Sequence, residues 1–176
     1  MRLLNFAMST ASPKKVLILC TGNSARSIIA EYLLRAKGRG RFETYSAGAL
    51  PTGRINPLAL WVLKTKYLID ASDARSKSWD EFRAVNFDFV ITVCDHARES
   101  CPVWPGQPVI AHWGSPDPAA VVGTEEEKQV AFINVASQIN RRIELFCALP
   151  EDKLTAMKLR EIGGKFQMMG EPSMAR

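Results

Sequence analysis

The sequence predicts one α/β domain, a three-layer sandwich in which helices cover both faces of a four-stranded parallel sheet. Short apolar, β-branched runs alternate along the chain with longer segments whose apolar residues recur at helical spacing. The first run, residues 16–19, is apolar without interruption, as expected of a central strand buried on both faces. Right-handed crossovers between such strands lead to the predicted order 2-1-3-4, with the first strand inside the sheet.

The predicted elements follow in alternation. We expect strands at residues 16–20, 42–47, 87–93 and 109–113, a short helix within 76–82, and one or two helical turns at 95–100. The main helices are expected at residues 28–36, 57–65 and 125–149, with a further amphipathic turn or two at 151–162. From Gly163 onward the chain is expected to fray.

Side-chain patterns indicate where these helices begin, end and face the core. Asn56 suits an N-cap and Pro57 a first helical turn. Thr124 and Glu127 have the spacing of a capping box, and Pro150 ends the long helix that follows. The inward face of the helix after Pro57 is expected to carry Leu58, Trp61, Val62 and Thr65. The long helix is expected to bury Phe132, Ala136, Ile139, Ile143 and Phe146.

We divide the chain into a flexible arm at residues 1–13, a folded domain at 14–150 and a C-terminal extension at 151–176. The formal charge is +5, but residues 16–150 carry 15 basic and 14 acidic side chains. This balance argues against nucleic acid as a partner. No run approaches the ~20 apolar residues of a membrane span, and the apolar part of the arm is too short for a secretion signal. We therefore expect a cytoplasmic protein without a membrane partner, with its four cysteines reduced, catalytic or redox-cycling.

The loop at residues 20–27 is the strongest candidate site. A thiol at a strand end, five residues and an arginine at a helix start would turn the loop's N–H groups around one point, which suits a tetrahedral oxyanion. The same groups favour a thiolate, so we expect a depressed pKa for Cys20 and a nucleophilic role. The alternative is a buried thiol beside a structural arginine. The expected anion-binding residues are Thr21, Gly22, Asn23, Ser24, Ala25, Arg26 and Ser27.

Asp117 is the predicted proton donor. It follows the fourth strand, whose carboxyl end meets the same sheet edge as Cys20, and two prolines flank it. The alternative is a simple Asp-Pro turn before a helix.

Two further cysteines lie near this edge. Cys94 ends the third strand and Cys101 follows seven residues later. If the intervening segment is helical, the two lie about 10 Å apart, beyond the ~7 Å Cα limit for a disulfide, so bonding them requires local unwinding. Two incidental thiols are the alternative. A zinc site that adds His96 and His112 fits no usual ligand spacing, and we expect neither a metal nor a cofactor.

The loop string CTGNSARS resembles the phosphate-binding loop of the low-molecular-weight protein tyrosine phosphatase superfamily, whose thiol-based arsenate reductases carry almost the same string. The resemblance covers residues 15–149 and implies a phosphatase-like catalytic domain in which Cys20 attacks an oxyanion held by Arg26. The segment around Cys94 and Cys101 resembles that of the thioredoxin-linked arsenate reductases. It implies a relay from Cys20 to Cys94 to Cys101, a Cys94–Cys101 redox disulfide, and a thioredoxin-like or glutaredoxin-like reductant.

Arsenate reductases of this type often hold potassium beside the loop, and Asn23, Glu31 and Ser46 match its ligands. Where the family has an acidic ligand this chain has Lys77, whose ammonium is expected to replace the ion; a solvent-exposed lysine is the alternative.

Two other functions stay open. A phosphatase of aryl or tyrosyl phosphate would use the same loop, but Ala119, Ala120 and Val121 stand where phosphatases typically place aromatic residues. A non-catalytic anion-binding or redox-sensing module is the second.

Overall fold

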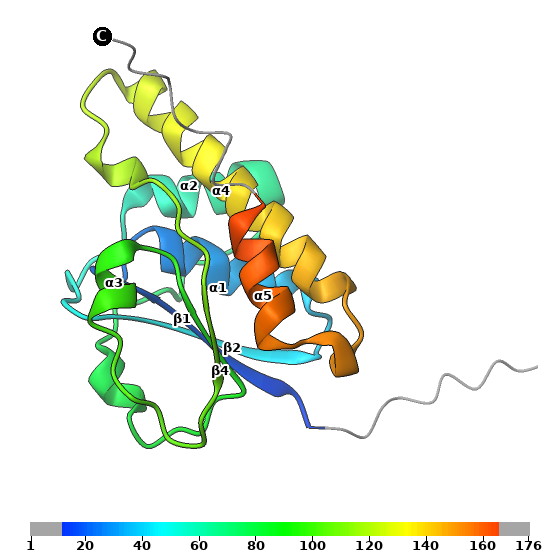
Figure 1. Ribbon diagram of the computed structural model, residues 1–176. Helices are drawn as coiled ribbons and strands as arrows, with labels where there is room; N and C mark the ends of the chain where they lie inside the picture. Colours follow the sequence, from blue (N-terminus) through cyan, green and yellow to red (C-terminus); the bar gives the residue numbers. More distant parts are fainter. Residues whose placement is uncertain (1–11, 166–176) are drawn as a thin grey trace, which may run out of the picture.

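The computed structural model describes residues 12–165, so the predicted arm at 1–13 lies almost entirely outside the described residues. The strands are β1 (Lys14–Cys20), β2 (Phe42–Gly48), β3 (Phe89–Thr92) and β4 (Val109–His112). The α-helices are α1 (Arg26–Lys37), α2 (Pro57–Tyr67), α3 (Asp95–Glu99), α4 (Glu125–Ala148) and α5 (Ala156–Gly164) (Figure 1). Three short 3₁₀ helices are η1 (Trp79–Phe82), η2 (Pro118–Ala120) and η3 (Glu151–Lys153).

The sheet confirms the predicted topology. Its four strands are parallel and ordered β2-β1-β3-β4. The register pairs Cys20 with Gly48, Leu19 with Thr92, and Thr92 with His112. The carboxyl ends of all four strands therefore meet at one edge, where ligands of open α/β sheets bind.

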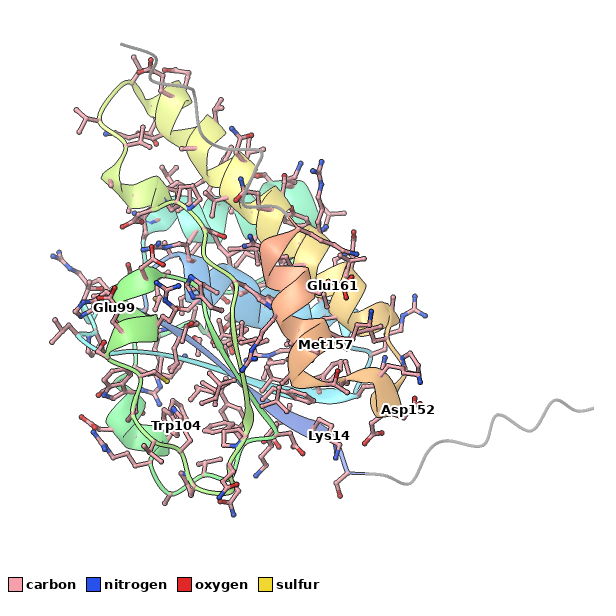
Figure 2. The ribbon with its side chains drawn as sticks, in the orientation of Figure 1. Lys14, Glu99, Trp104, Asp152, Met157 and Glu161 are labelled. Carbon is pink, nitrogen blue, oxygen red and sulfur yellow. The ribbon has the colours of Figure 1, made fainter. Side chains whose placement is uncertain are left out.

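Helices and loops cover the sheet from both sides, as the predicted three-layer sandwich requires. α1 contacts α2 and α4, and α5 contacts α4 and β4, so these four helices form one layer (Figure 1). On the other side, a chain of edge-to-face rings joins Tyr45, Phe82, Phe87 and Trp104. Figure 2 shows Trp104 at a distance from α5, which carries Met157. Among the described helices none is both long and apolar enough to cross a membrane.

The long helix behaves as its sequence predicts. Thr124 and Glu127 form the capping box at the start of α4, and all five predicted stripe residues are buried. The predicted face of α2 is confirmed in part: Val62 is buried and Leu58 and Trp61 pack against the core, but Thr65 is exposed. Ala59 and Leu63, which were not predicted, are buried instead. Residues 58–63 are apolar without interruption, so their periodicity does not determine which side faces the core.

The C-terminal part of the described chain also differs from expectation. Gly163 and Gly164 do not fray but belong to α5, and Gly163 is buried. Leu154, Leu159 and Ile162 join the same core as the sheet. Burial of this apolar face against β4 outweighs the poor helix propensity of the two glycines.

Candidate active site

The loop from Cys20 to Ser27 is shaped by hydrogen bonds on its outer side. The carbonyls of Cys20, Thr21, Gly22 and Ser24 accept hydrogen bonds from backbone N–H groups of residues 49, 50, 52 and 56. Because these carbonyls are engaged outside the loop, its N–H groups are free to point inward. Gly48 is essential to this approach, since a Cβ there would lie 2.5 Å from the Thr21 carbonyl oxygen. This requirement arises between segments that are far apart along the chain, so the sequence alone does not reveal it.

Cys20 lies at the bottom of the loop with 4 % of its surface exposed. Its Sγ accepts a hydrogen bond from the backbone N–H of Asn23 at 3.1 Å and lies 2.8 Å from Ser27 Oγ. Asn23 has a φ of 44°, the left-handed conformation that an asparagine tolerates well. The loop thus brings the predicted nucleophile and its hydrogen-bonding partners together.

The pKa of Cys20 differs from the predicted direction. Burial raises the pKa of this thiol above its ordinary value, although the hydrogen bonds from Ser27 and Asn23 lower it. Arg26 is engaged elsewhere, because its guanidinium bonds to Ser115 and lies beside Asp117. Desolvation of the thiolate therefore dominates, and the expectation of a depressed pKa is corrected.

The Asn23 side chain holds the loop from behind. Its amide nitrogen donates to Ser27 Oγ and Ser46 Oγ at 2.9 Å each, and its oxygen accepts from the Lys77 N–H at 2.7 Å. Asn23 is fully buried. Its side chain therefore stiffens the loop, while its backbone N–H faces the sulfur.

The Lys77 ammonium contacts Glu31, one of the residues expected to match potassium ligands. Its Nζ is 3.3 Å from Glu31 Oε2 and donates to the Arg75 carbonyl at 3.1 Å. Glu31 also accepts from Ser46 and pairs with Arg35 at 2.6 Å. Lys77 and Glu31 are both buried, so the alternative of a solvent-exposed lysine is excluded.

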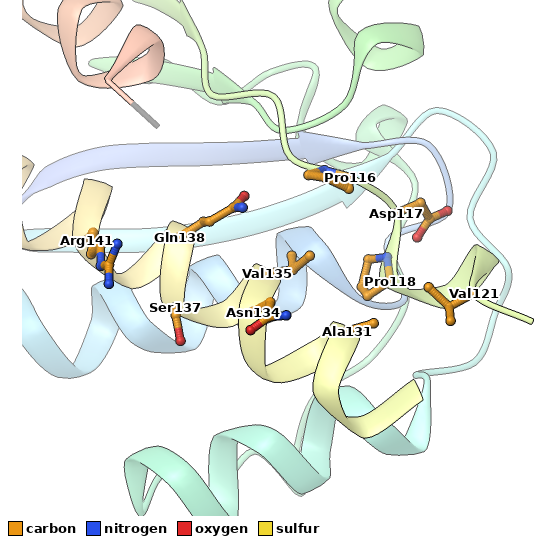
Figure 3. A pocket seen from close by; sticks show the side chains of 10 residues that line it. All are labelled: Pro116, Asp117, Pro118, Val121, Ala131, Asn134, Val135, Ser137, Gln138 and Arg141. Atoms are coloured by element: carbon orange, nitrogen blue, oxygen red, sulfur yellow. The ribbon is translucent and has the colours of Figure 1, made fainter. Parts of the chain in front are cut away.

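Arg26 and Asp117 meet at the mouth of the loop. Arg26 Nη2 lies 3.4 Å from Asp117 Oδ2, and Nη1 donates to the Ser115 carbonyl at 2.9 Å. Asp117 remains 45 % exposed in its side chain. Figure 3 shows it between Pro116 and Pro118, at one end of a cavity of about 540 Å³ along α4. A carboxyl group that is accessible and held by Arg26 is positioned to exchange protons with a bound oxyanion.

The second thiol reaches the loop, and the third lies beyond a helix. Cys94 is 6 % exposed, and its Sγ is 3.3 Å from Thr21 Oγ1. Cys101 follows α3 and is partly buried, which raises the pKa of its thiol. All four cysteines are free. α3 therefore stands between Cys94 and Cys101, as the spacing predicted.

His112, at the end of β4, lies beside Thr92 and Asp95. Its Nδ1 lies 2.9 Å from Thr92 Oγ1, and its Nε2 lies 3.2 Å from Asp95 Oδ1. Burial lowers its pKa. Within residues 12–165 no three His, Cys, Asp or Glu side chains are placed to hold a metal ion.

Arg142 is a site residue that the sequence analysis missed. It lies on α4 with 1 % of its surface exposed and donates three hydrogen bonds to residues 113–115, just before Asp117. The sequence does contain an indication: Arg142 lies three residues after Ile139 and four before Phe146, a spacing that places it on the apolar face of the helix. A cation in that position has to find polar partners inside the protein.

Known proteins share this architecture. Residues 15–156 match the family model of the low molecular weight phosphotyrosine protein phosphatases. A protein of Halalkalibacterium halodurans named arsenate reductase is 38 % identical over 133 residues, which are 76 % of this chain and 94 % of that protein.

Two solved structures extend the comparison. An arsenate reductase in the phosphate binding state has a TM-score of 0.66 and 29 % identity, covering 77 % of this chain and 97 % of its own. A thioredoxin-dependent arsenate reductase of Corynebacterium glutamicum has a TM-score of 0.54 and 30 % identity, covering 77 % of this chain and 64 % of its own.

Proposed function

The chain belongs to the low molecular weight phosphotyrosine protein phosphatase family, and we propose that its reaction within that family is the reduction of arsenate to arsenite. One observation carries the choice between reduction and ester hydrolysis. Hydrolysis needs a single cysteine, whereas here the Cys94 thiol also reaches the loop, 3.3 Å from Thr21 Oγ1. A second thiol beside the nucleophile supplies the electrons that reduction requires.

The first step forms a covalent adduct. Arsenate binds to the inward N–H groups of the loop and to Arg26, in place of the contacts Arg26 now makes. The Cys20 thiol transfers its proton to the incoming arsenate dianion, and the sulfur attacks arsenic. One As–O bond breaks as the S–As bond forms, and Asp117 donates a proton so that the oxygen leaves as water. Arsenic remains pentavalent.

The second step reduces arsenic. The Cys94 sulfur, as a thiolate, attacks Cys20, so that an S–S bond forms and the S–As bond breaks. The electron pair of that bond stays on arsenic, which becomes trivalent and leaves as arsenite, while the two sulfurs are oxidised to a disulfide.

The third step regenerates the nucleophile. The Cys101 thiolate attacks Cys94, which frees Cys20 and leaves a Cys94–Cys101 disulfide. This requires residues 95–99 to unwind, because α3 separates the two cysteines. An external dithiol then donates two electrons by thiol–disulfide exchange. We propose a thioredoxin-like protein for this role, by similarity to the thioredoxin-dependent reductase of Corynebacterium glutamicum.

This relay operates in a reducing compartment, so we place it in the cytoplasm. Cys20, Cys94 and Cys101 all have to return to the thiol form between turnovers.

Hydrolysis of aryl phosphates is a second activity of the same site. It needs only Cys20, Arg26 and Asp117, which the fold brings to one edge. The small residues Ala119, Ala120 and Val121 offer no aromatic surface for a tyrosyl ring. We therefore expect slow hydrolysis of small aryl phosphates alongside arsenate reduction.

The test is arsenate-dependent NADPH oxidation in the presence of thioredoxin and thioredoxin reductase. The wild type should turn over and Cys20→Ser should not. Cys147→Ser is the matched control, because Cys147 packs on α4 away from the loop and its loss should leave turnover unchanged. A wild type that reduces no arsenate with thioredoxin, or with glutaredoxin and glutathione, yet hydrolyses aryl phosphates, would contradict the proposal in favour of a phosphatase.

A further inference from the structure

The helix α5 lies outside the match to the family, which ends at its first residue, Ala156. It nevertheless packs against β4 and the loop that leads to Asp117 (Figure 1). Trp113 Nε1 donates to the Leu159 carbonyl at 2.9 Å. At the other end of α5, Gly163 lies so close to β4 that a Cβ would be 2.1 Å from the His112 carbonyl oxygen.

Arg142 joins this helix to the Asp117 loop. Nη1 donates to the carbonyls of Trp113 and Gly114 and to Ser115 Oγ, each at 2.9 Å, and Nη2 donates to the Gly163 carbonyl at 3.1 Å. Within residues 12–165 this guanidinium forms no ion pair, and burial lowers the pKa of Arg142 with no acidic side chain opposing the shift. Burying such a cation costs free energy of folding, so Arg142 is better explained by the residues that it holds in place than by a gain in stability.

Ser115 is held from two sides. Arg142 binds its side chain, and Arg26 donates to its carbonyl at 2.9 Å. Two residues later, after Pro116 with its restricted φ, the Asp117 carboxylate lies 3.4 Å from Arg26 Nη2. The position of the acid relative to the anion loop therefore depends on where Arg142 and Gly163 place residues 113–115.

We propose that α5, acting through Gly163 and Arg142, is a positioning element that holds Asp117 for proton transfer. This rests on the proposed role of Asp117 as the acid. Arg142 does not touch the reacting atoms but acts through Ser115. A displacement of about 1 Å is enough to cost on the order of 100-fold in rate, so a rigid support for this loop has a direct catalytic consequence.

Two adjacent glycines provide a matched test. A methyl group at Gly163 has to move the backbone of α5 or of β4, whereas a methyl group at Gly164 meets no atom of residues 12–165 within 4 Å. Both lie in the last turn of α5, so Gly163→Ala and Gly164→Ala change helix propensity alike. Arg142→Met removes the hydrogen bonds that join Gly163 to residues 113–115, and Arg142→Lys retains the positive charge without the several N–H donors of the guanidinium.

The measurement is kcat/KM, which reports the steps up to departure of the phenol, for phenyl phosphate, a poor leaving group, and for 2,4-dinitrophenyl phosphate, which leaves without protonation. Gly163→Ala and Arg142→Met should lose on the order of 10-fold to 100-fold on phenyl phosphate, a part of the usual contribution of a general acid, and less than about 3-fold on the dinitrophenyl ester. Inhibition by inorganic phosphate should stay as in wild type, because the anion loop is untouched. Gly164→Ala should match wild type, and Arg142→Lys should restore part of the loss.

The ratio of the two kcat/KM values does not depend on how much enzyme is folded, so partial unfolding cannot imitate the effect. Equal losses on both esters, or a Gly163→Ala ratio equal to that of Gly164→Ala, would overturn the positioning role. Asp117→Asn is the reference. If Asp117→Asn loses no more activity on phenyl phosphate than on the dinitrophenyl ester, or if wild type hydrolyses neither ester, the assignment of Asp117 as the acid fails. If Asp117→Asn loses more on phenyl phosphate and Gly163→Ala does not, only the role of α5 fails.

Discussion

Replacing Lys77 by methionine tests whether its ammonium stabilises the back of the anion loop. At the 3.3 Å separation of Lys77 Nζ and Glu31 Oε2, Coulomb attraction at an effective dielectric of 20 is about 5 kcal/mol. Desolvation of the ammonium offsets part of it. Glu31 also keeps Arg35 at 2.6 Å, so the carboxylate does not become an uncompensated buried charge. We therefore expect Lys77→Met to lower the free energy of unfolding by about 2 kcal/mol, below the 3–5 kcal/mol of a fully broken buried pair.

Urea unfolding at pH 7 in sodium and in potassium buffers measures this loss. Lys77→Ala leaves room beside Asn23, Glu31 and Ser46, so potassium should stabilise it more than sodium does; the wild type should not distinguish the ions. Lys158→Met is the control, since that lysine pairs with Glu161 at the surface and its loss should change stability by less than about 0.5 kcal/mol. The reasoning is refuted if Lys77→Met unfolds like wild type, or if potassium stabilises the wild type more than sodium does.

Three other predictions follow from the site. Because burial raises the pKa of Cys20, its alkylation by iodoacetamide should rise with a midpoint above the ~8.5 of a free thiol, and phosphate should protect it; a midpoint near 6 would contradict this. Because burial lowers the pKa of His112, the unfolded chain binds its proton more tightly, and stability should fall as pH drops below about 6.5; His112→Gln should weaken that dependence, and an unchanged dependence in this variant would contradict the reasoning. Asn23→Ala and Asn23→Gly both lose three buried hydrogen bonds and should unfold about 3–5 kcal/mol more easily, with Ala the worse because φ is 44°; a less stable Gly variant would show that the left-handed backbone is unimportant.

Local sequence patterns predicted most of the fold because each pattern is compatible with only one kind of element or strand order. Apolar runs broken by glycine and proline defined the strands, and the right-handed crossover rule left the order 2-1-3-4. The strand, loop and arginine at residues 20–26 also predicted the turn of the chain around Cys20 that the structure contains. The face of α2 was predicted only in part, because six successive apolar residues do not indicate which side of a helix faces the core.

The features that sequence reasoning missed depend on contacts between distant segments. The pKa of Cys20 depends on how deeply the loop is buried and on the engagement of Arg26 with Ser115, 89 residues away. Gly163 reads as a helix breaker until β4 is placed against it. Arg142 reads as an interruption of an apolar stripe, and only the packed structure reveals the carbonyls it binds.

The most direct test of the relay is a single turnover of arsenate by reduced enzyme without an external dithiol. After alkylation of free thiols, mass spectrometry of a non-reduced digest identifies the disulfide that forms. Cys101→Ser should release one arsenite and retain a Cys20–Cys94 disulfide, whereas wild type should retain Cys94–Cys101. Arsenite released from Cys101→Ser with Cys20 and Cys94 both still alkylatable would contradict the relay.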